Sequence, residues 1–278
     1  MTRRTRQKQK KMQEVGASKQ LEVRYRNEMD ALLKYMLDIA LNELREPETI
    51  NDALPDYLKS LSAKANRIFD MLDKIDLGAI ANAMASRIVN TANNVNRQRF
   101  DKKAGQMFGI DLKGALASSG KAVQDELDLA RYRNADLIKS VATEFKKEIS
   151  DTIMQNVYEG QRSTNLITQI KERYHVTESR AKLIARNETS RINGDLVRIR
   201  AQALGSKTYV WSGVMDERNF KRTDHYVMNG MLCKWDDKTV FSDDNGVTWK
   251  KRKSIGGVEA HPSEQINCRC AALAQVEF

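Results

Sequence analysis

Between residues 21 and 205 the hydrophobic positions recur at steps of three and four, which is the spacing of an amphipathic α-helix. The first stretch begins at Leu21 and ends before Pro47, because a residue that precedes proline is disfavoured in a helix. The same period continues over residues 56–74, 79–100 and 121–160, and no proline interrupts any of these stretches. The pattern predicts a long helical body.

Two features interrupt this helical pattern. Residues 104–120 contain four glycines and a small apolar cluster, which indicates an ordered connector or a bend. Further along, a short helix is predicted over Asn165–Tyr174, and another is predicted to begin with Thr177 as its N-cap. Gly205 is expected to end that last helix.

The pattern changes after Gly205. The segment TYVWSG is rich in residues that favour strands, and CAALAQVEF is a candidate closing strand. Asn229-Gly230 and Asn245-Gly246 each lie between apolar arms, which is a signal for a two-residue hairpin turn. The expected fold class is therefore mostly α, with a long helical body and a small α+β C-terminal part that contains β-hairpins.

Positive charge is concentrated at the N-terminus. Residues 1–20 carry a net charge of +6 out of the +10 of the whole chain. Such a segment is either a binder of nucleic-acid phosphates or a solvated arm that aids solubility. No aromatic residue precedes Tyr25, so base stacking is not expected there. The residues expected to contact DNA are Arg3, Arg4, Arg6, Lys8, Lys10 and Lys11.

These patterns divide the chain into three regions. Residues 1–20 are expected to be a flexible basic arm, and residues 21–120 a helical region with its connector at 104–120. Residues 121–278 are expected to be helical to about residue 205, with a β-containing tail over 206–278.

Composition limits the classes of protein to which the chain can belong. With 41% hydrophobic and 30% charged residues, the chain is expected to be soluble and to bury a core. No apolar run approaches the roughly 18 residues of a membrane span, and no apolar stretch follows the basic start as in a secretory signal. Cys233, Cys268 and Cys270 are too few for a disulfide framework, which favours folding in a reducing cytoplasm.

Five stretches occur in an informative order: NRQRFDKKAGQMFGIDL, NADLIKSV, SRAKLIARNETSRINGDLVRIRAQALG, YVWSGVMDERNFKRTDHYVMNGMLCKW and HPSEQINCRC. Together they resemble the Mu F-like minor head protein family of tailed bacteriophages, which includes head morphogenesis proteins. The resemblance covers roughly residues 95–275 and places residues 121–278 in a Mu F-like region.

The resemblance implies a non-enzymatic, low-copy virion protein that is synthesised in the bacterial host cytoplasm and lies inside the head. Its implied partners are the portal protein, the major capsid protein or scaffold, and the double-stranded DNA genome, with no membrane partner. It would act in head assembly, genome retention or genome delivery. The matching residues expected to be structural are Arg186, Glu188, Asp216, Arg218, His225, Gly230, His261, Cys268 and Cys270.

The chain also departs from the family pattern. The run Asp216, Arg218, Arg222 and His225 contains an insertion, and it lacks the proline that often precedes the histidine in the family. Residues 243–260 resemble an expanded loop.

No cofactor is expected, and zinc is the alternative. Its ligands would be His225, His261, Cys268 and Cys270. Against zinc, the Cys-x-Cys spacing is tight, and in a strand the two cysteines would point to opposite faces. Some relatives carry a further cysteine pair near residues 216–225, which this chain lacks.

Catalysis is the second alternative. The order of His225, Asn229 and His261 is similar to that of small metal-dependent nucleases, in which a histidine activates water beside a metal. The rival interpretation is that each histidine is a hydrogen-bonded structural residue. A metal-dependent nuclease or hydrolase acting on DNA is therefore kept as the alternative function. A cytoplasmic DNA-binding regulator is not favoured, because no recognition-helix motif is present.

Other residues have competing interpretations. Glu188 is either catalytic or a structural carboxylate, clamped by Arg186 and Arg191 of its helix and pairing with Arg218 or Asp216 of the β tail. Trp211, Trp235 and Trp249 are expected to pack in the β tail. Trp249 is adjacent to the basic run 250–253, which could instead contact DNA or an acidic protein surface.

Overall fold

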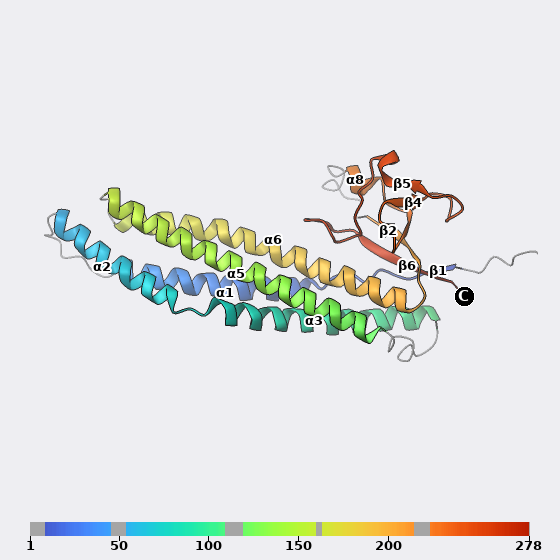
Figure 1. The fold of residues 1–278 in the computed structure, drawn as a ribbon, viewed down its shortest axis with the longest axis horizontal. Helices are drawn as coiled ribbons and strands as arrows, with labels where there is room; N and C mark the ends of the chain where they lie inside the picture. Colours follow the sequence, from blue (N-terminus) through green and yellow to red (C-terminus); the bar gives the residue numbers. More distant parts are fainter. Residues whose placement is uncertain (1–8, 46–53, 109–118, 160–162, 214–222, 278) are drawn as a thin grey trace, which may run out of the picture. The chain divides into compact units, whose positions relative to one another are not determined.

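The computed structural model describes residues 9–45, 54–108, 119–159, 163–213 and 223–277, and Figure 1 labels most of its helices and strands. The α-helices within these residues are α1 (Lys19–Arg45), α2 (Leu54–Asp73), α3 (Leu77–Phe108), α5 (Gly120–Glu159), α6 (Ser163–Ala203) and α8 (Thr223–Tyr226). The strands are β1 (Gln9–Lys11), β2 (Thr208–Ser212), β3 (Leu232–Lys234), β4 (Val240–Ser242), β5 (Lys250–Lys251) and β6 (Ala271–Glu277). A short 3-10 helix, η1 (Arg252–Ile255), follows β5. The mostly α fold class with a small β-containing part is confirmed.

Helix α6 is one continuous helix, and the prediction of two helices in this region is wrong. Thr177, the expected N-cap, lies inside α6, where its hydroxyl donates to the Arg173 carbonyl at 3.0 Å. The hydroxyl of Ser179 bonds in the same way to the His175 carbonyl at 3.0 Å. Because Ser and Thr hydroxyls can bond to the preceding helical turn, their presence does not require a helix start.

The predicted connector at residues 104–120 is partly helical. Helix α3 continues to Phe108, and α5 begins at Gly120. The middle of the expected connector, residues 109–118, lies outside the described residues. The helical period therefore extends further into this stretch than its glycine content indicates.

The chain forms two compact units. One comprises residues 22–87 and 131–185, and we call it the helical unit. The other comprises residues 1–21, 88–130 and 186–278, and we call it the sheet unit. Helices α1, α3, α5 and α6 each contribute residues to both units.

The core of the helical unit consists of apolar side chains at helical spacing. In α1 they include Met29, Leu33 and Met36, and in α5 they include Phe145 and Ile149, all at most 2% exposed. A polar contact lies among them, since the Tyr25 hydroxyl donates to Asn134 Oδ1 at 2.8 Å between two buried residues. Helix amphipathicity therefore accounts for most of this core.

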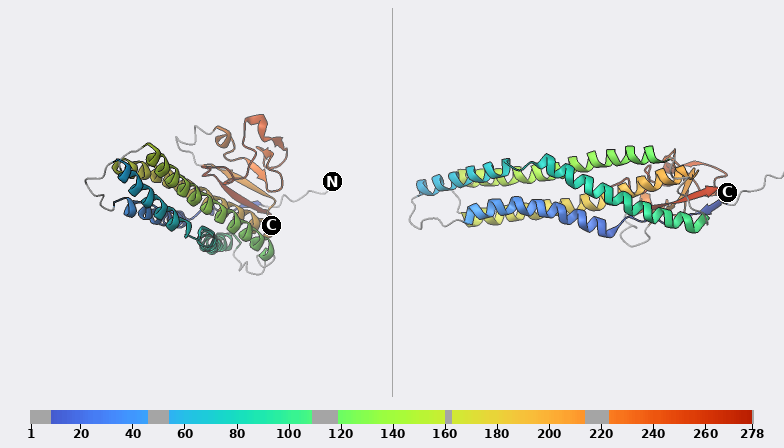
Figure 2. Two further views of the ribbon diagram at one scale, coloured as in Figure 1. Left: turned by 60° about the vertical axis from the view of Figure 1, so that its left-hand side comes forward. Right: turned by 90° about the horizontal axis from the view of Figure 1, so that it is seen from below.

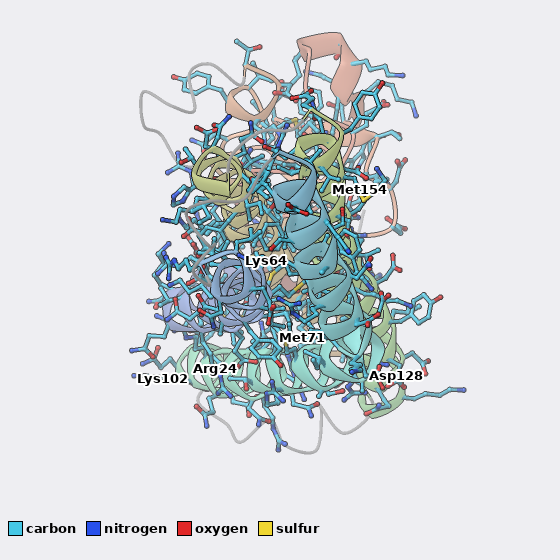
Figure 3. All side chains as sticks on the ribbon, turned by 90° about the vertical axis from the view of Figure 1, so that its left-hand side faces the viewer. Arg24, Lys64, Met71, Lys102, Asp128 and Met154 are labelled. Carbon is cyan, nitrogen blue, oxygen red and sulfur yellow. The ribbon has the colours of Figure 1, made fainter. Side chains whose placement is uncertain are left out.

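Charged side chains of the helical unit lie mainly on its surface and pair between helices. Arg67 of α2 bonds to Glu43 of α1 at 2.7 Å, and Arg87 of α3 bonds to Glu28 of α1 at 2.9 Å. Arg24 of α1 is exposed, whereas Lys64 of α2 is 3% exposed (Figure 3). Among the described helices, none combines the length and the apolar character that crossing a membrane requires.

The sheet unit is organised around a six-stranded sheet in the order β1-β6-β2-β3-β4-β5. Every neighbouring pair is antiparallel, and the longest pairing joins β2 to β6 from Thr208↔Gln275 to Ser212↔Ala271. The closing strand predicted from CAALAQVEF is therefore present as β6, and it lies inside the sheet because β1 pairs with its outer edge. Strands β1 and β6 lie side by side in Figure 2.

Part of the segment predicted to be a flexible arm forms a strand. Gln9–Lys11 form strand β1, and Met12 and Val15 are buried in the sheet core at 1% and 4% exposure. The Met12 N–H also donates to the Ala274 carbonyl at 2.9 Å. Burial of these apolar side chains and strand pairing with β6 fix the second half of the segment that was expected to be flexible. Residues 1–8 lie outside the described residues.

The two Asn-Gly dipeptides both form turns, but neither forms the predicted two-residue hairpin. Asn229-Gly230 ends the turn after α8, where Gly230 has φ 81° and its N–H donates to the Trp211 carbonyl at 2.8 Å. Asn245 and Gly246 both have positive φ, yet they lie within a longer loop between β4 and β5. Asp244 shapes that loop by accepting bonds from the Ser242 hydroxyl and the Thr248 amide.

Candidate functional site

His225, Cys268 and Cys270 form a buried cluster in the sheet unit. His225 lies on the single-turn helix α8, and the two cysteines immediately precede β6. All three side chains are buried, at 1%, 6% and 4% exposure. Their nitrogen and sulfur atoms lie within 4.8 Å of one another. The Nδ1 atom of His225 is 3.6 Å from Cys268 Sγ and 3.5 Å from Cys270 Sγ.

The two cysteines face the same histidine because this segment is not a strand. Residues 268–270 precede β6, and Asn267 before them has φ 62°. This turn is held by the Asn267 N–H, which donates to Asn187 Oδ1 at 2.9 Å, and by the Cys268 N–H, which donates to the Gln265 carbonyl at 3.1 Å. The expectation that the two thiols would point to opposite faces is therefore wrong.

Polar neighbours orient the cluster. The other ring nitrogen of His225, Nε2, lies 2.8 Å from Gln265 Oε1, and the imidazole meets the Trp211 ring edge-on at a centroid distance of 5.8 Å. The Ser263 N–H donates to Cys268 Sγ at 3.2 Å. Hydrogen bonding from Cys270 lowers the pKa of the Cys268 thiol to about 4 in spite of its burial, and contacts with His225 and Ser263 act in the same direction.

Three of the four zinc ligands considered from the sequence thus come together. An imidazole nitrogen with two sulfurs is a donor set that suits zinc. Among the described residues, the cluster contains three side chains of the types that can bind a metal, one histidine and two cysteines. All three cysteines are free thiols, in line with the sequence argument against a disulfide framework.

His261 has other partners. Its Nδ1 lies 3.0 Å from the Tyr209 hydroxyl, and its backbone N–H donates to Glu264 Oε2 at 3.0 Å. Burial lowers the pKa of His261 to about 4, with the Glu264 carboxylate opposing that effect. His261 is therefore a hydrogen-bonded residue at the edge of the sheet core.

Cys233, the third cysteine, is also buried, and it lies beside Tyr209 and Arg252. Burial raises the pKa of the Cys233 thiol to about 11.

The nuclease-like set has separate partners as well. Asn229 Oδ1 accepts the Gly213 N–H at 2.8 Å and so connects the end of β2 to the turn after α8. His225 faces two thiols and Gln265, and His261 faces Tyr209. The described geometry therefore supports the structural interpretation of these three side chains.

Arg252 is a central residue of the sheet unit that the sequence did not reveal. It is 0% exposed, although exposed lysines flank it on both sides. Its guanidinium donates to the carbonyls of Val240, Val258 and Ala260 at 3.1, 3.1 and 2.7 Å, and to the Tyr209 hydroxyl at 3.1 Å. The sequence of the run KKRK does not distinguish Arg252 from its basic neighbours. A local pattern therefore could not predict that Arg252 is the buried one.

The remaining basic residues of the 250–253 run are largely paired. Lys250 bonds both carboxylate oxygens of Asp243 at 2.9 Å, and Lys253 lies 3.3 Å from Glu259. Lys234 lies over the Trp249 ring at 4.5 Å, while Trp211 and Trp235 are buried as predicted. The acidic neighbours reduce the net positive charge of this surface. The surface is therefore a poorer candidate for contact with DNA.

A second buried cation joins two helices of the sheet unit. Arg200 of α6 donates to Asn96 and, at 2.6 Å, to Asn93, both in α3. Burial lowers the pKa of Arg200 to about 10. Asn193 of α6 extends the network by donating to the Val15 carbonyl at 2.7 Å, so the segment after β1 is tied to the same helix.

The Glu188 region is only partly described. Glu188 is 6% exposed, while Arg186 is exposed and Arg191 is intermediate. The proposed partners Asp216 and Arg218 lie outside the described residues. Burial of Glu188 fits a structural carboxylate, and its pairing with those two residues stays a prediction.

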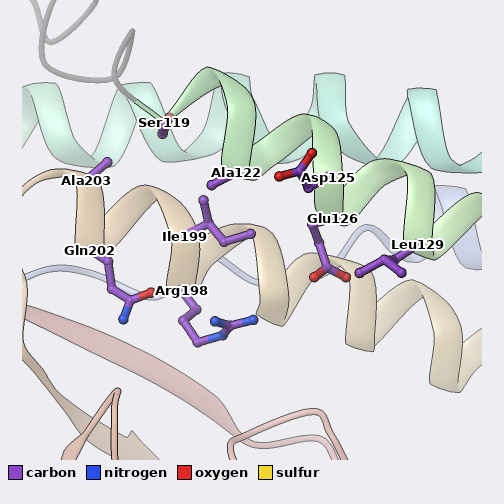
Figure 4. A pocket seen from close by; sticks show the side chains of 9 residues that line it. All are labelled: Ser119, Ala122, Asp125, Glu126, Leu129, Arg198, Ile199, Gln202 and Ala203. Atoms are coloured by element: carbon purple, nitrogen blue, oxygen red, sulfur yellow. The ribbon is translucent and has the colours of Figure 1, made fainter.

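A shallow groove lies between the start of α5 and the end of α6 (Figure 4). Its volume is about 460 Å³, and Asp125, Glu126 and Arg198 supply its charges. Leu129, at 63% exposure, forms one edge. The groove contains neither the cysteines nor the histidines singled out above.

Comparison with known proteins identifies the relatives of this chain. Residues 147–273 match the model of a family described as Phage Mu protein F like protein. An uncharacterized protein of Haemophilus influenzae is 26% identical over 268 residues, which cover 95% of this chain. This chain spans 55% of that relative's length. No solved structure matches the chain.

Proposed function

Since residues 147–273 match the Phage Mu protein F like family, we propose that the chain acts as a minor head protein of a tailed bacteriophage. In this role it associates with the portal protein and with the major capsid protein or scaffold. It lies inside the head and contacts the packaged double-stranded DNA. It acts in head assembly, genome retention or genome delivery.

The family match carries this proposal. The matched region extends from the second half of α5 through α6 and into the first part of β6, so it includes β2 to β5 and the His225 cluster. The family is one of phage head morphogenesis, and this makes the chain a candidate virion component.

The proposed contact with DNA rests on charge. Arg3, Arg4, Arg6 and Lys8 precede β1, and Lys11 within β1 is exposed. Strand pairing of β1 with β6 anchors the chain directly after this basic segment. Because most of the chain's excess positive charge is in residues 1–20, we propose that this segment binds phosphates without sequence preference.

The DNA contact is tested with a charge-removal variant. Replacing Arg3, Arg4, Arg6, Lys8, Lys10 and Lys11 by glutamine should weaken binding of the full chain to duplex DNA. It should also reduce the slope of log affinity against log salt by about 0.9 for each phosphate that the variant no longer binds. The matched control replaces six exposed lysines, five on helices (Lys59, Lys102, Lys121, Lys139 and Lys171) and Lys74 in the turn after α2. Equal decreases in affinity in the two variants would show that only net charge matters and would contradict a dedicated segment.

The proposed docking on head proteins rests on exposed apolar residues of α5. Tyr132 is 81% exposed, and Met154 and Tyr158 are 56% and 92% exposed and share a helix face at a spacing of four. Binding of the coexpressed portal protein should weaken in a Tyr132→Ser/Met154→Ser/Tyr158→Ser variant. The control is Val247→Ser, at an exposed loop position with 71% exposure. Unchanged portal binding by the triple variant would contradict docking through α5.

The location is tested on purified virions of the encoding phage. We expect mass spectrometry to find a few copies per particle, and external protease to cleave the protein only after the head is opened. Absence from virions would contradict the proposal as a whole. Metal-dependent cleavage of plasmid DNA by the full chain, abolished in a His225→Ala variant, would instead favour the nuclease alternative.

A further inference from the structure

We propose that His225, Cys268 and Cys270 bind one zinc ion, and that this ion joins helix α8 to the segment before β6. The site goes beyond the proposed function, which assigns no metal to the chain. The three donor side chains are buried together, and they come from segments separated by 43 and 45 residues.

The distances within the cluster fit a tetrahedral ion. Zinc lies about 2.0–2.1 Å from imidazole nitrogen and about 2.3 Å from thiolate sulfur. With a tetrahedral angle between these bonds, the nitrogen and sulfur atoms lie about 3.6 Å apart. The two observed separations from His225 Nδ1 to sulfur are 3.6 and 3.5 Å. The histidine nitrogen is therefore spaced from both sulfurs as the ion requires, and all three donor atoms lie within 4.8 Å of one another.

The orientation of the histidine supports the same site. Its Nε2 lies 2.8 Å from Gln265 Oε1, an acceptor for the ring N–H. With the proton on Nε2, the lone pair of Nδ1 points towards the two sulfurs. A metal-binding histidine commonly donates its second ring nitrogen to an oxygen in this way, which fixes the tautomer.

The backbone around the cysteines is also arranged for the site. The turn at Asn267 places both sulfurs on the same side, and the Ser263 N–H donates to Cys268 Sγ at 3.2 Å. Amide donors to sulfur are suited to a thiolate ligand, because they stabilise its negative charge. The three side chains occupy three of four tetrahedral positions and leave one for a further donor.

Two other arrangements would explain the same cluster. In one, a thiol donates a hydrogen bond to Nδ1 and no metal binds. In the other, Cys268 and Cys270 form a disulfide under oxidising conditions. Both predict a folded protein without zinc, so metal content distinguishes them from the proposal.

The first experiment measures metal in the full chain purified under reducing conditions. We expect about one zinc per chain by elemental analysis. Cobalt substitution should produce the absorption of a tetrahedral site with thiolate-to-metal charge transfer. A folded wild-type chain that contains no zinc, and that gives no such spectrum with cobalt, would overturn the proposal.

Variants then identify the ligands. Cys268→Ser and Cys270→Ser should each reduce the charge-transfer absorption and the zinc content, whereas Cys233→Ser is the matched control. Cys233 is also buried in the sheet core, but it is not a member of the cluster. An equal decrease in the zinc content of Cys233→Ser would contradict the assigned ligands.

A variant beside the ligands keeps the test independent of misfolding. Gln265→Ala retains all three ligands and removes only the acceptor at His225 Nε2. Removal of such a partner typically lowers metal affinity about 10–100-fold. A chelator competition with folded Gln265→Ala should show that decrease, and unchanged zinc affinity would contradict the role of Gln265.

Discussion

The helical unit and the sheet unit are stabilised by different kinds of contact. In the helical unit the core side chains repeat along each helix, and most charged residues pair at the surface. In the sheet unit, Arg252, Arg200 and His225 are buried polar groups with specific acceptors. Buried polar groups are costly unless every hydrogen bond is made. The sheet unit should therefore be the more sensitive of the two to single polar substitutions.

The largest expected effect is at Arg252. Arg252→Leu leaves the carbonyls of Val240, Val258 and Ala260 without their guanidinium donor. This should lower the free energy of unfolding by on the order of 3 kcal/mol or more. Denaturant unfolding followed by tryptophan fluorescence measures it, because all three tryptophans lie in the sheet unit. Lys253→Leu, at an exposed neighbour, should change stability by no more than about 0.5 kcal/mol.

Ile149→Ala tests how much a buried apolar side chain contributes to the stability of the helical unit. Ile149 is 0% exposed, so truncation should cost roughly 2–5 kcal/mol through reduced apolar burial and the remaining cavity. Unfolding followed by far-ultraviolet circular dichroism measures the change, with Met154→Ala at an exposed position of the same helix as control. Tryptophan fluorescence of the same variant then shows whether the two units unfold together. An Ile149→Ala variant as stable as wild type would contradict the helical core.

A smaller effect is expected at the buried polar contact of the helical unit. Tyr25→Phe removes the hydroxyl that donates to Asn134 Oδ1 and should cost roughly 1–3 kcal/mol. Tyr35→Phe is the control, since Tyr35 is 57% exposed. If both substitutions are neutral, this buried hydrogen bond adds nothing to the stability of the helical unit.

The last prediction concerns pH and His261. Its pKa is lowered from 6.5 to about 4 by burial, so between these values the unfolded state binds a proton that the folded state does not. The contribution of neutral His261 is present above pH 6.5 and disappears as the pH falls towards 4. An NMR titration of the His261 ring should show the low pKa. A His261→Asn variant should lose less stability than wild type over this range, and a ring that titrates near 6.5 would contradict the burial argument.

Local patterns predicted the helices well and their boundaries less well. The three- and four-residue period around Leu33, Ile149 and Ile192 reflects burial within the same helix, so it is visible from neighbours alone. Thr177 was misleading because the same hydroxyl can cap a helix or bond to the preceding turn. The Asn-Gly dipeptides marked turns correctly, but loop length depends on which strands pair.

Part of the candidate site was also visible in the sequence. His225, Cys268 and Cys270 stood out because histidine and cysteine are rare in this chain. Their mutual contact was not visible, because a strand-like Cys-x-Cys segment would separate the two sulfurs. The positive φ of Asn267 and the contact with Asn187, 80 residues earlier, decide the geometry instead.

Four properties could be predicted from the order of residues: the helical class, the strands after Gly205, the resemblance to a phage head family and the concentration of charge near the N-terminus. Three others required the folded chain, namely that β1 pairs with β6, that Arg252 is buried, and that His225 faces two cysteines. The two groups differ in range. Helical periodicity is set by residues three or four positions apart, whereas the partner of a strand, a buried cation or a thiol is chosen among distant segments by packing and hydrogen bonding.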